Sequence, residues 1–376
     1  MTHILSNNVF NVFAFRILNM LSQYSVETTK ALTKEHKSKH GIYFTPKSVR
    51  DLVWEHIDTT PVNILEPSAG SGEFFDDCQE RFPDADIVGV ELDANMANSR
   101  GFVNRDFLKW ESDTSFDLII GNPPFVQRSK GHVSDKNIVS GRSNLYVEFI
   151  YKCLTRHLAP GGTLAFVIPA SIGNSAFYAP TRKLLCALDI VAFKVLDTHD
   201  FVETSTRICV LVVKNSPGIG RFVYNGFLCE NPPCVSTSSI GTLDVTFKTG
   251  HCHAQVKQYF TKSSATPFFT NRDIGMGSLV LGDKTRYLSD GTTKTFSGRA
   301  LLVKTASAAR RGGRFVFGFA LYEGDRWSAD NDVIIIRGKD IDIVYDILQK
   351  QETLDFINML TTNGHINMKL LKSIPM

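Results

Sequence analysis

Short apolar runs that resemble buried strands alternate with helical patterns through the first 214 residues, and this alternation constrains the fold more than any other feature. The strand-like runs are 62–65, 87–90, 116–120, 163–168, 190–196 and 208–213, and apolar residues at helical spacing mark 47–57, 74–81, 145–157 and 178–188. Apolar strands separated by helices are typical of a parallel sheet covered on both faces. We therefore predict an α/β fold with a doubly wound, mostly parallel sheet. Only residues 197–207 join the last two strands, which predicts an antiparallel hairpin at the sheet edge.

The composition of the chain changes near residue 215, after which Thr, Ser and Gly are frequent and the apolar runs are short. A length of 376 residues suits two domains. We expect a first domain over 1–214 and a second, mixed and β-rich domain over 215–376. A helix is expected at about 341–360.

Charge is distributed unevenly between these halves. Residues 1–214 carry 22 Lys and Arg against 24 Asp and Glu, whereas 215–376 carry 19 against 14. Residues 244–316 alone carry 12 basic residues against 4 acidic ones. Such a concentrated positive field suits a polyanionic partner, although a merely soluble basic surface has the same composition.

Composition also argues against membrane and metal proteins. The first 25 residues are too polar for a signal peptide, and no other stretch is long and apolar enough to cross a membrane. The seven cysteines form no CxxC pair and read as reduced core thiols, and the Cys and His residues between 229 and 253 match no common zinc-finger spacing. We expect a soluble cytoplasmic protein without a metal site.

An acidic, glycine-rich loop follows the first strand. Residues 64–73 read Ile-Leu-Glu-Pro-Ser-Ala-Gly-Ser-Gly-Glu. Gly70 and Gly72 allow a tight turn and a close approach of the backbone to a ligand. Glu66 suits a cationic amino group rather than a phosphate, and the loop lacks the Lys-Ser/Thr ending of a phosphate-binding loop.

Two further acidic residues follow at the ends of later segments. Glu91 lies 21 residues after Gly70, at the end of the second strand, where a carboxylate can accept both hydroxyls of a ribose. Asp106 could accept from the amino group of an adenine while Phe107 packs on its ring. Each carboxylate alone reads as a surface residue, but their intervals together favour a nucleoside ligand.

Asn122-Pro123-Pro124-Phe125 directly follows the third long apolar strand. The turn offers an amide oxygen, a backbone carbonyl and an aromatic ring, and its prolines restrict the backbone. Two acceptors on the hydrogens of a flat exocyclic amine draw its nitrogen toward tetrahedral geometry and make it a better nucleophile. A chance Asn-Pro-Pro turn is the alternative for the tetrapeptide taken alone.

In this order the motifs resemble those of the γ-class, TaqI-like DNA adenine-N6 methyltransferases, which use S-adenosyl-L-methionine and belong to restriction–modification systems. That family has a Thr-Pro element, a Glu-Pro-x-x-Gly-x-Gly loop, an acidic ribose ligand, an Asp-Phe pair, Asn-Pro-Pro-Tyr/Phe and a target-recognition domain. Tyr43-Phe44-Thr45-Pro46 matches the first element. The resemblance covers about 30–215 through specific motifs, and beyond 215 it depends on size and position.

The resemblance implies a catalytic, cofactor-binding first domain and a role for each matching residue. Thr45, Glu66 and the Gly70 backbone would hold the methionine portion of the cofactor, Glu91 the ribose, Asp106 and Phe107 the adenine, and Phe166 would line the site. The side-chain oxygen of Asn122 and the carbonyl of Pro123 would accept from the target N6 amine, and Phe125 would stack on a flipped adenine. Phe201 matches a second stacking aromatic, or is a packed residue at a hairpin tip.

The resemblance also implies double-stranded DNA as partner and residues 215–376 as the recognition domain. Arg128 and Lys130 lie in a polar stretch, 126–144, that is either a segment over the DNA or a solvated loop. The candidates for contact in the second domain are Lys284, Arg286, Lys294, Arg299, Lys304 and the densest cluster, Arg310, Arg311 and Arg314. We expect a monomer that methylates a short palindrome, such as TCGA, and protects it from a cognate restriction endonuclease in a bacterium or a virus-infected cell.

Two other interpretations remain open. The same Asn-Pro-Pro-Phe loop serves methyltransferases that act on protein glutamine or on RNA. A DNA-binding specificity protein with a decayed methylase domain is the non-catalytic alternative, against which the intact Glu66, Glu91, Asp106 and Asn122 argue.

Overall fold

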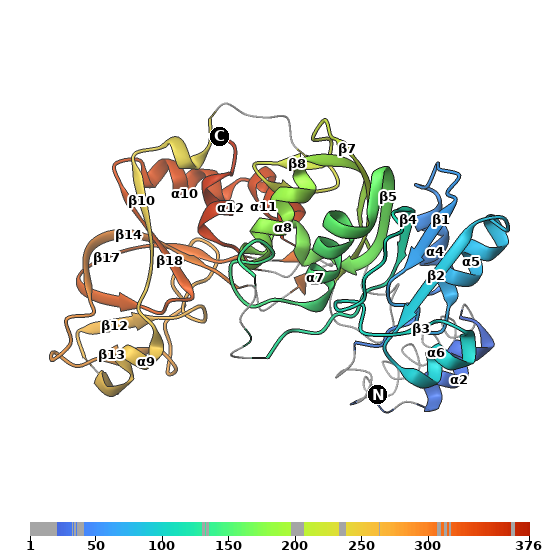
Figure 1. Ribbon diagram of the computed structural model, residues 1–376. Coiled ribbons are helices and arrows are strands. Elements are labelled where there is room, and N and C mark those ends of the chain that lie inside the picture. The colour runs from blue at the N-terminus through green and yellow to red at the C-terminus, as the bar shows by residue number, and fades with distance from the viewer. Residues whose placement is uncertain are drawn as a thin grey trace, which may run out of the picture. The chain divides into compact units, whose positions relative to one another are not determined.

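The structure is a computed structural model that divides into two compact units, Met1–Pro232 and Pro233–Met376 (Figure 1). It describes residues 21–31, 33, 35, 41–129, 132, 135–196, 207–232, 238–262, 264–306, 310–311, 314–315, 317–361 and 365–376. Each unit is described by itself.

The first unit contains a seven-stranded sheet in the order β3-β2-β1-β4-β5-β7-β6. Its strands are β1 (Asn63–Glu66), β2 (Asp86–Glu91), β3 (Val103–Asn104), β4 (Phe116–Gly121), β5 (Leu158–Pro169), β6 (Leu188–Val195) and β7 (Ile208–Pro217). Strands β1 to β5 pair in parallel, whereas β7 runs antiparallel to both β5 and β6. The predicted doubly wound sheet and its antiparallel hairpin are confirmed. The two-residue strand β3 was not predicted.

The helices of this unit cover both faces of the sheet. They are α2 (Gln23–Ala31), α4 (Lys47–Trp54), α5 (Glu73–Arg81), α6 (Ala94–Arg100), α7 (Leu145–Lys152), which continues as a π-helical turn η1 (Cys153–His157), and α8 (Ala179–Cys186), with 3-10 turns η2 (Ala170–Gly173) and η3 (Ala176–Tyr178). Side chains of α7 and α8 share one hydrophobic core with the sheet, and those of α4 and α5 share the other. Helix α6, whose start is capped by Asp93, was not predicted from the sequence.

The first unit ends later than the predicted boundary between 214 and 215. A short hairpin, β8 (Val223–Tyr224) and β9 (Phe227–Leu228), follows the sheet, and Leu228 is buried in the α7–α8 core. The buried Arg182 donates to the Gly226 carbonyl (2.8 Å). These contacts attach residues up to 232 to the first unit, because they bury apolar surface and satisfy a guanidinium.

The second unit is built on another seven-stranded sheet, in the order β10-β18-β14-β17-β12-β13-β11. Its strands are β10 (Val245–Thr249), β11 (Phe260–Thr261), β12 (Thr266–Phe269), β13 (Arg286–Leu288), β14 (Phe296–Lys304), β17 (Phe319–Ala329) and β18 (Val333–Gly338), and β15 (Arg310–Arg311) and β16 (Arg314–Phe315) form a separate hairpin. The helices are α9 (His253–Val256), α10 (Ile341–Gln349), α11 (Gln351–Leu360) and α12 (Met368–Lys372), with 3-10 turns η4 (Ile240–Thr242) and η5 (Lys257–Tyr259).

The helix expected at about 341–360 is two helices, α10 and α11. Lys350 between them is extended (φ −68°, ψ 139°). The break changes the phase of the apolar face: Leu348 is buried in α10, and Thr353 and Phe356 are buried in α11. A continuous helix would instead turn Glu352 toward the core, one turn after Leu348.

No helix in the described ranges is long and apolar enough to cross a membrane.

Candidate functional site

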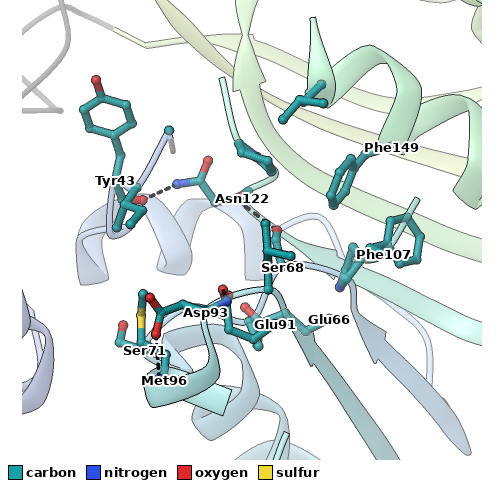
Figure 2. A pocket seen from close by; sticks show the side chains of 18 of the residues that line it. Tyr43, Glu66, Ser68, Ser71, Glu91, Asp93, Met96, Phe107, Asn122 and Phe149 are labelled. Carbon is teal, nitrogen blue, oxygen red and sulfur yellow. Dashed lines mark hydrogen bonds between the residues drawn. The ribbon is translucent and has the colours of Figure 1, made fainter. Parts of the chain in front are cut away.

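A cavity of about 490 Å³ opens in the first unit where β1, β2 and β4 end. Its lining includes Thr45, Glu66, Gly70, Glu91, Asp106, Phe107, Asn122 and Arg128, eight of the residues singled out from the sequence. The carboxyl ends of parallel strands are the usual ligand-binding edge of such sheets. Figure 2 shows Glu66 and Glu91, the rings of Phe107 and Phe149, and Asn122 arranged around this space.

Glu66, the last residue of β1, places a buried carboxyl group at the cavity. Its side chain is only 3% exposed, and its Oε2 has no hydrogen-bond partner among the described residues. Burial is the main cause that raises the pKa of Glu66 well above the usual range, and Glu91, Asp76 and Asp77 raise it further. An unpartnered acceptor of this kind fits a cationic ligand group, which would restore the ionised form.

Glu91, at the end of β2, is fixed by the backbone of the glycine-rich loop. Its Oε2 accepts from the Gly70 N–H (2.7 Å) and its Oε1 from the Asp93 N–H (2.8 Å). Burial raises the pKa of Glu91, and the N–H groups of Asp93 and Gly70 oppose that rise. Each carboxylate oxygen has a second lone pair. The arrangement therefore suits acceptance from two neighbouring hydroxyl groups.

An aromatic pair forms another part of the cavity lining. Phe107 is 3% exposed, and its ring centroid lies 4.8 Å from that of Phe149 on α7 (Figure 2). Asp106 is half-buried beside it, and its Oδ1 accepts from the Leu108 N–H (3.1 Å). The cavity thus offers a flat apolar surface next to a carboxylate, which suits a heteroaromatic ring that carries an amino group.

Asn122 directly follows β4, and its amide is held on one side only. The Nδ2 group donates to the backbone carbonyl of Tyr43 (2.7 Å), and the Oγ of Ser68 donates to the backbone carbonyl of Asn122 (3.2 Å) (Figure 2). The Oδ1 of Asn122 is buried and has no partner among the described residues. A carbonyl accepts and never donates, so the Tyr43 contact assigns the amide orientation and leaves Oδ1 for a ligand donor.

Phe125 does not contribute to the lining of this cavity. Its ring stacks on Tyr43 (centroids 6.2 Å apart, 21° between planes) and meets Tyr146 edge-on (6.3 Å, 83°). Pro123 is buried, and Pro124 lines the cavity. The role predicted for Phe125 as a stacking surface stays a prediction.

Phe166 is placed elsewhere than expected. The residue is on β5, fully buried with Leu164 and Ile168 in the core that α7 and α8 cover, and it is not among the residues that line the cavity. Ala165 and Val167 face the opposite core, as the alternation of a strand requires. Phe166 is therefore a core residue and does not line this cavity.

The predicted DNA-contacting residues are only partly described. Arg128 lines the cavity and binds Glu148 through Nε, at 3.0 Å from Oε1. Phe201 and Lys130 lie outside the described residues. Arg310 and Arg311 in β15 pair with Phe315 and Arg314 in β16. This hairpin is in the second unit, and its backbone is fixed by Asn358, whose Oδ1 accepts from the Phe315 N–H (2.7 Å).

Several residues of the site were missed from the sequence. Tyr43, Ser68, Met96 and Phe149 line the cavity, and the buried Arg50 donates to the carbonyl of Thr45, another lining residue. Tyr43 belongs to the Thr-Pro element, but its backbone carbonyl gives no signal in the sequence, because every residue has one. Within the described residues, no group of three or more His, Cys, Asp or Glu side chains could hold a metal ion.

Two protein families match this chain. Residues 65–191 match the family described as Eco57I restriction-modification methylase, and residues 27–100 match the one described as N-6 DNA Methylase. The modification methylase CviBIII of Paramecium bursaria Chlorella virus NC1A is 52% identical over 375 residues, which cover 95% of this chain and 99% of that relative. The type II methyltransferase M.CvrRI of Paramecium bursaria Chlorella virus XZ-6E is 35% identical over 383 residues, with the same coverage.

Among solved structures, the type IIG restriction endonuclease BpuSI aligns with 93% of this chain and 61% of its own, at 9% identity and a TM-score of 0.43. The viral relatives align along nearly their whole length. Their similarity therefore extends over both units of this chain.

Proposed function

Because this chain belongs to the DNA modification methylases of restriction–modification systems, we propose that it methylates the N6 amine of an adenine in a specific duplex DNA sequence. The observation that carries this proposal is the unpartnered Oδ1 of Asn122, at the end of β4, next to a cavity that suits a nucleoside ligand. A buried acceptor without a donor is costly, so its partner is expected to be a substrate.

S-adenosyl-L-methionine is the cofactor expected of this family, and the cavity residues fit it. When bound, it supplies an electrophilic methyl group on a sulfonium. Glu66, through its unpartnered Oε2, and Thr45 would hold its cationic methionine portion, with the backbone of Gly70. Glu91 would accept from the ribose hydroxyls, and Asp106 with Phe107 would bind the adenine ring.

The adenine that receives the methyl group must leave the duplex, because its N6 is not reachable inside the stack. Asn122 Oδ1 and the Pro123 carbonyl would each accept a hydrogen bond from N6. Both oxygens would then stabilise the positive charge that develops on that nitrogen during transfer. Stacking on Phe125, and on Phe201 outside the described residues, would offset the cost of flipping by about 1–3 kcal/mol per ring.

DNA is the substrate of this family, and a restriction–modification system implies a cognate restriction enzyme. We propose the γ-class arrangement, with the second unit as the reader of a short palindrome such as TCGA. Arg128, Lys130, Arg310, Arg311 and Arg314 would contact the DNA. Methylation of one strand at a time needs a single site, so a monomer in the cytoplasm is sufficient.

The test is transfer of label from radiolabelled S-adenosylmethionine to separate samples of unmethylated duplex DNA, RNA and a protein extract. Label recovered as N6-methyladenine from DNA is the expected result. Label in RNA or in glutamine of protein alone would assign the site to one of the other methyltransferase classes. Label in cytosine would contradict the adenine target while leaving the family unchanged.

A further inference from the structure

Residues 41–45 contact the Asn122–Phe125 turn at three points, although they lie about 80 residues earlier in the chain. The first contact is the hydrogen bond from Asn122 Nδ2 to the Tyr43 carbonyl (2.7 Å). Without that acceptor the amide could rotate by half a turn and present its NH₂ group where Oδ1 now lies. An amine donor such as N6 would then meet two hydrogens instead of a lone pair.

The second contact requires a residue without a side chain. Gly41 has φ +68°, and a Cβ added there would lie 2.9 Å from the Phe125 nitrogen and 3.1 Å from the Pro124 Cβ. A Cβ at that position would also lie 2.8 Å from Cγ2 of Val126. The Phe125 nitrogen and the Pro124 Cβ are backbone and ring atoms, so they cannot move aside without displacing the turn. The third contact is the stacking of the Tyr43 ring on Phe125.

The other end of the segment is fixed by a buried guanidinium. Arg50 on α4 donates through Nη1 to the Thr45 carbonyl (2.8 Å), and the same nitrogen lies 2.7 Å from Glu73 Oε2. Its Nε donates to Asp77 Oδ2 (2.8 Å) on α5, and the side chain is only 8% exposed. Since α5 begins directly after the Glu66–Gly72 loop, the segment is anchored to the cofactor-binding side of the cavity.

We propose that residues 41–45 are a positioning strap, which holds Asn122 Oδ1 and the Phe125 ring in the geometry that receives the target amine. This inference rests on the proposed function and goes beyond cofactor binding by the Thr-Pro element. Thr45 lines the cofactor cavity while Tyr43 holds the base-accepting turn, so the strap connects the two sites. The strap acts through Asn122, and none of its backbone contacts needs to touch the base.

The test compares Gly41→Ala with Gly161→Ala in the full chain. Gly161 also has a left-handed backbone (φ +75°), but an added Cβ there meets no described atom within 4 Å. Both variants therefore carry the same conformational cost, and only Gly41→Ala displaces the turn. The measurements are kcat, KM for DNA, the dissociation constant for S-adenosylmethionine and the melting temperature.

For Gly41→Ala we expect kcat on unmethylated duplex DNA to fall about 10- to 100-fold, as a displacement near 1 Å in a positioned group does. Cofactor affinity should change by less than about threefold, because the cavity residues that carry charge are not displaced. Gly161→Ala should match the wild type in kcat. Equal kcat values in the two alanine variants would overturn the proposed positioning role of residues 41–45. An equal loss of cofactor affinity and of kcat in Gly41→Ala would overturn it too.

A second variant covers the case in which Gly41→Ala does not fold. Tyr43→Leu keeps the carbonyl that binds Asn122 and removes only the ring that stacks on Phe125. We expect a smaller fall in kcat with unchanged cofactor affinity, and an unchanged kcat would remove the ring from the strap. A wild-type chain that labels RNA or protein but not DNA would refute the proposed function instead, and the same variants then test the strap on that substrate.

Discussion

The polar side chains that the sequence singled out for ligand binding are satisfied differently in the two units of this protein. In the first unit, Glu66 Oε2 and Asn122 Oδ1 are buried beside one cavity without partners among the described residues. In the second unit, Arg299, a candidate for DNA contact, instead donates to Asp342 within the unit (2.8 Å). Unsatisfied buried acceptors indicate what a ligand must donate, whereas exposed ion pairs carry little information about a partner.

Of the substitutions considered below, loss of an unpartnered acceptor at the cavity should lower kcat the most. Asn122→Ala should lower kcat by about 10²- to 10³-fold, because it removes one of the two groups proposed to stabilise charge on N6. Affinity for S-adenosylmethionine should stay close to the wild type. Single-turnover methylation of duplex DNA measures the first quantity and equilibrium binding the second.

Asn98→Ala, at an exposed position on α6, is the matched control and should behave as the wild type. If kcat of Asn122→Ala were close to that of the control, Oδ1 would not be the group that receives the reacting amine.

Loss of a buried ion pair in the first unit should lower the free energy of unfolding more than loss of an exposed ion pair in the second unit. Arg50→Met leaves Glu73 and Asp77 without their cation in a buried site, and should lower the free energy of unfolding by about 3–5 kcal/mol. Arg299→Met removes the exposed pair with Asp342 and should change the melting temperature little. Thermal and urea denaturation measure both. Similar losses of stability in the two variants would contradict this expected difference between buried and exposed ion pairs.

Because the pKa of Glu66 is raised, both the free energy of unfolding and the affinity for the cofactor should change with pH in a defined direction. The folded, cofactor-free chain holds a proton there that the unfolded chain releases, so the free energy of unfolding falls as pH rises from the ordinary carboxyl pKa toward the raised one. Affinity for the cationic cofactor should rise over the same window, since the ionised form binds it and a proton is released.

Calorimetric titrations in buffers of different ionisation enthalpy measure that proton release. Glu66→Gln should weaken cofactor binding by roughly 10- to 100-fold and abolish the pH dependence. If the variant kept the pH dependence of the wild type, the released proton would come from another group.

The smallest predicted effect concerns the basic hairpin of the second unit. Arg310→Ala combined with Arg311→Ala should weaken DNA binding about tenfold at moderate salt and reduce the salt slope of log affinity by about 2. Cofactor affinity should not change. Arg299→Ala is the paired control, because Asp342 already binds that guanidinium. An unchanged salt slope in the double variant would exclude these two arginines from the interface.

The first unit was predicted more completely than the second because its signals are local. Apolar runs, glycines and prolines specify strands and turns within a few residues, and the helices at 47–54, 73–81 and 179–186 begin and end close to the predicted positions. The order of the strands in the sheet was not predicted and comes from the structure alone. In the second unit the short alternating runs left the pairing open, and the break at Lys350 became visible only from the buried faces of α10 and α11.

By itself, the sequence determined the chemical groups of the site and their order along the chain: Glu66, Glu91, Asp106 and Asn122 end or follow successive strands. Only the tertiary structure decided that Phe166 belongs to the core, that Phe149 faces Phe107, and that the Tyr43 carbonyl orients the Asn122 amide. The physical reason is the range of each interaction. Backbone preferences act between neighbouring residues, whereas the direction in which an amide points depends on a backbone group 79 residues away that any side chain could carry.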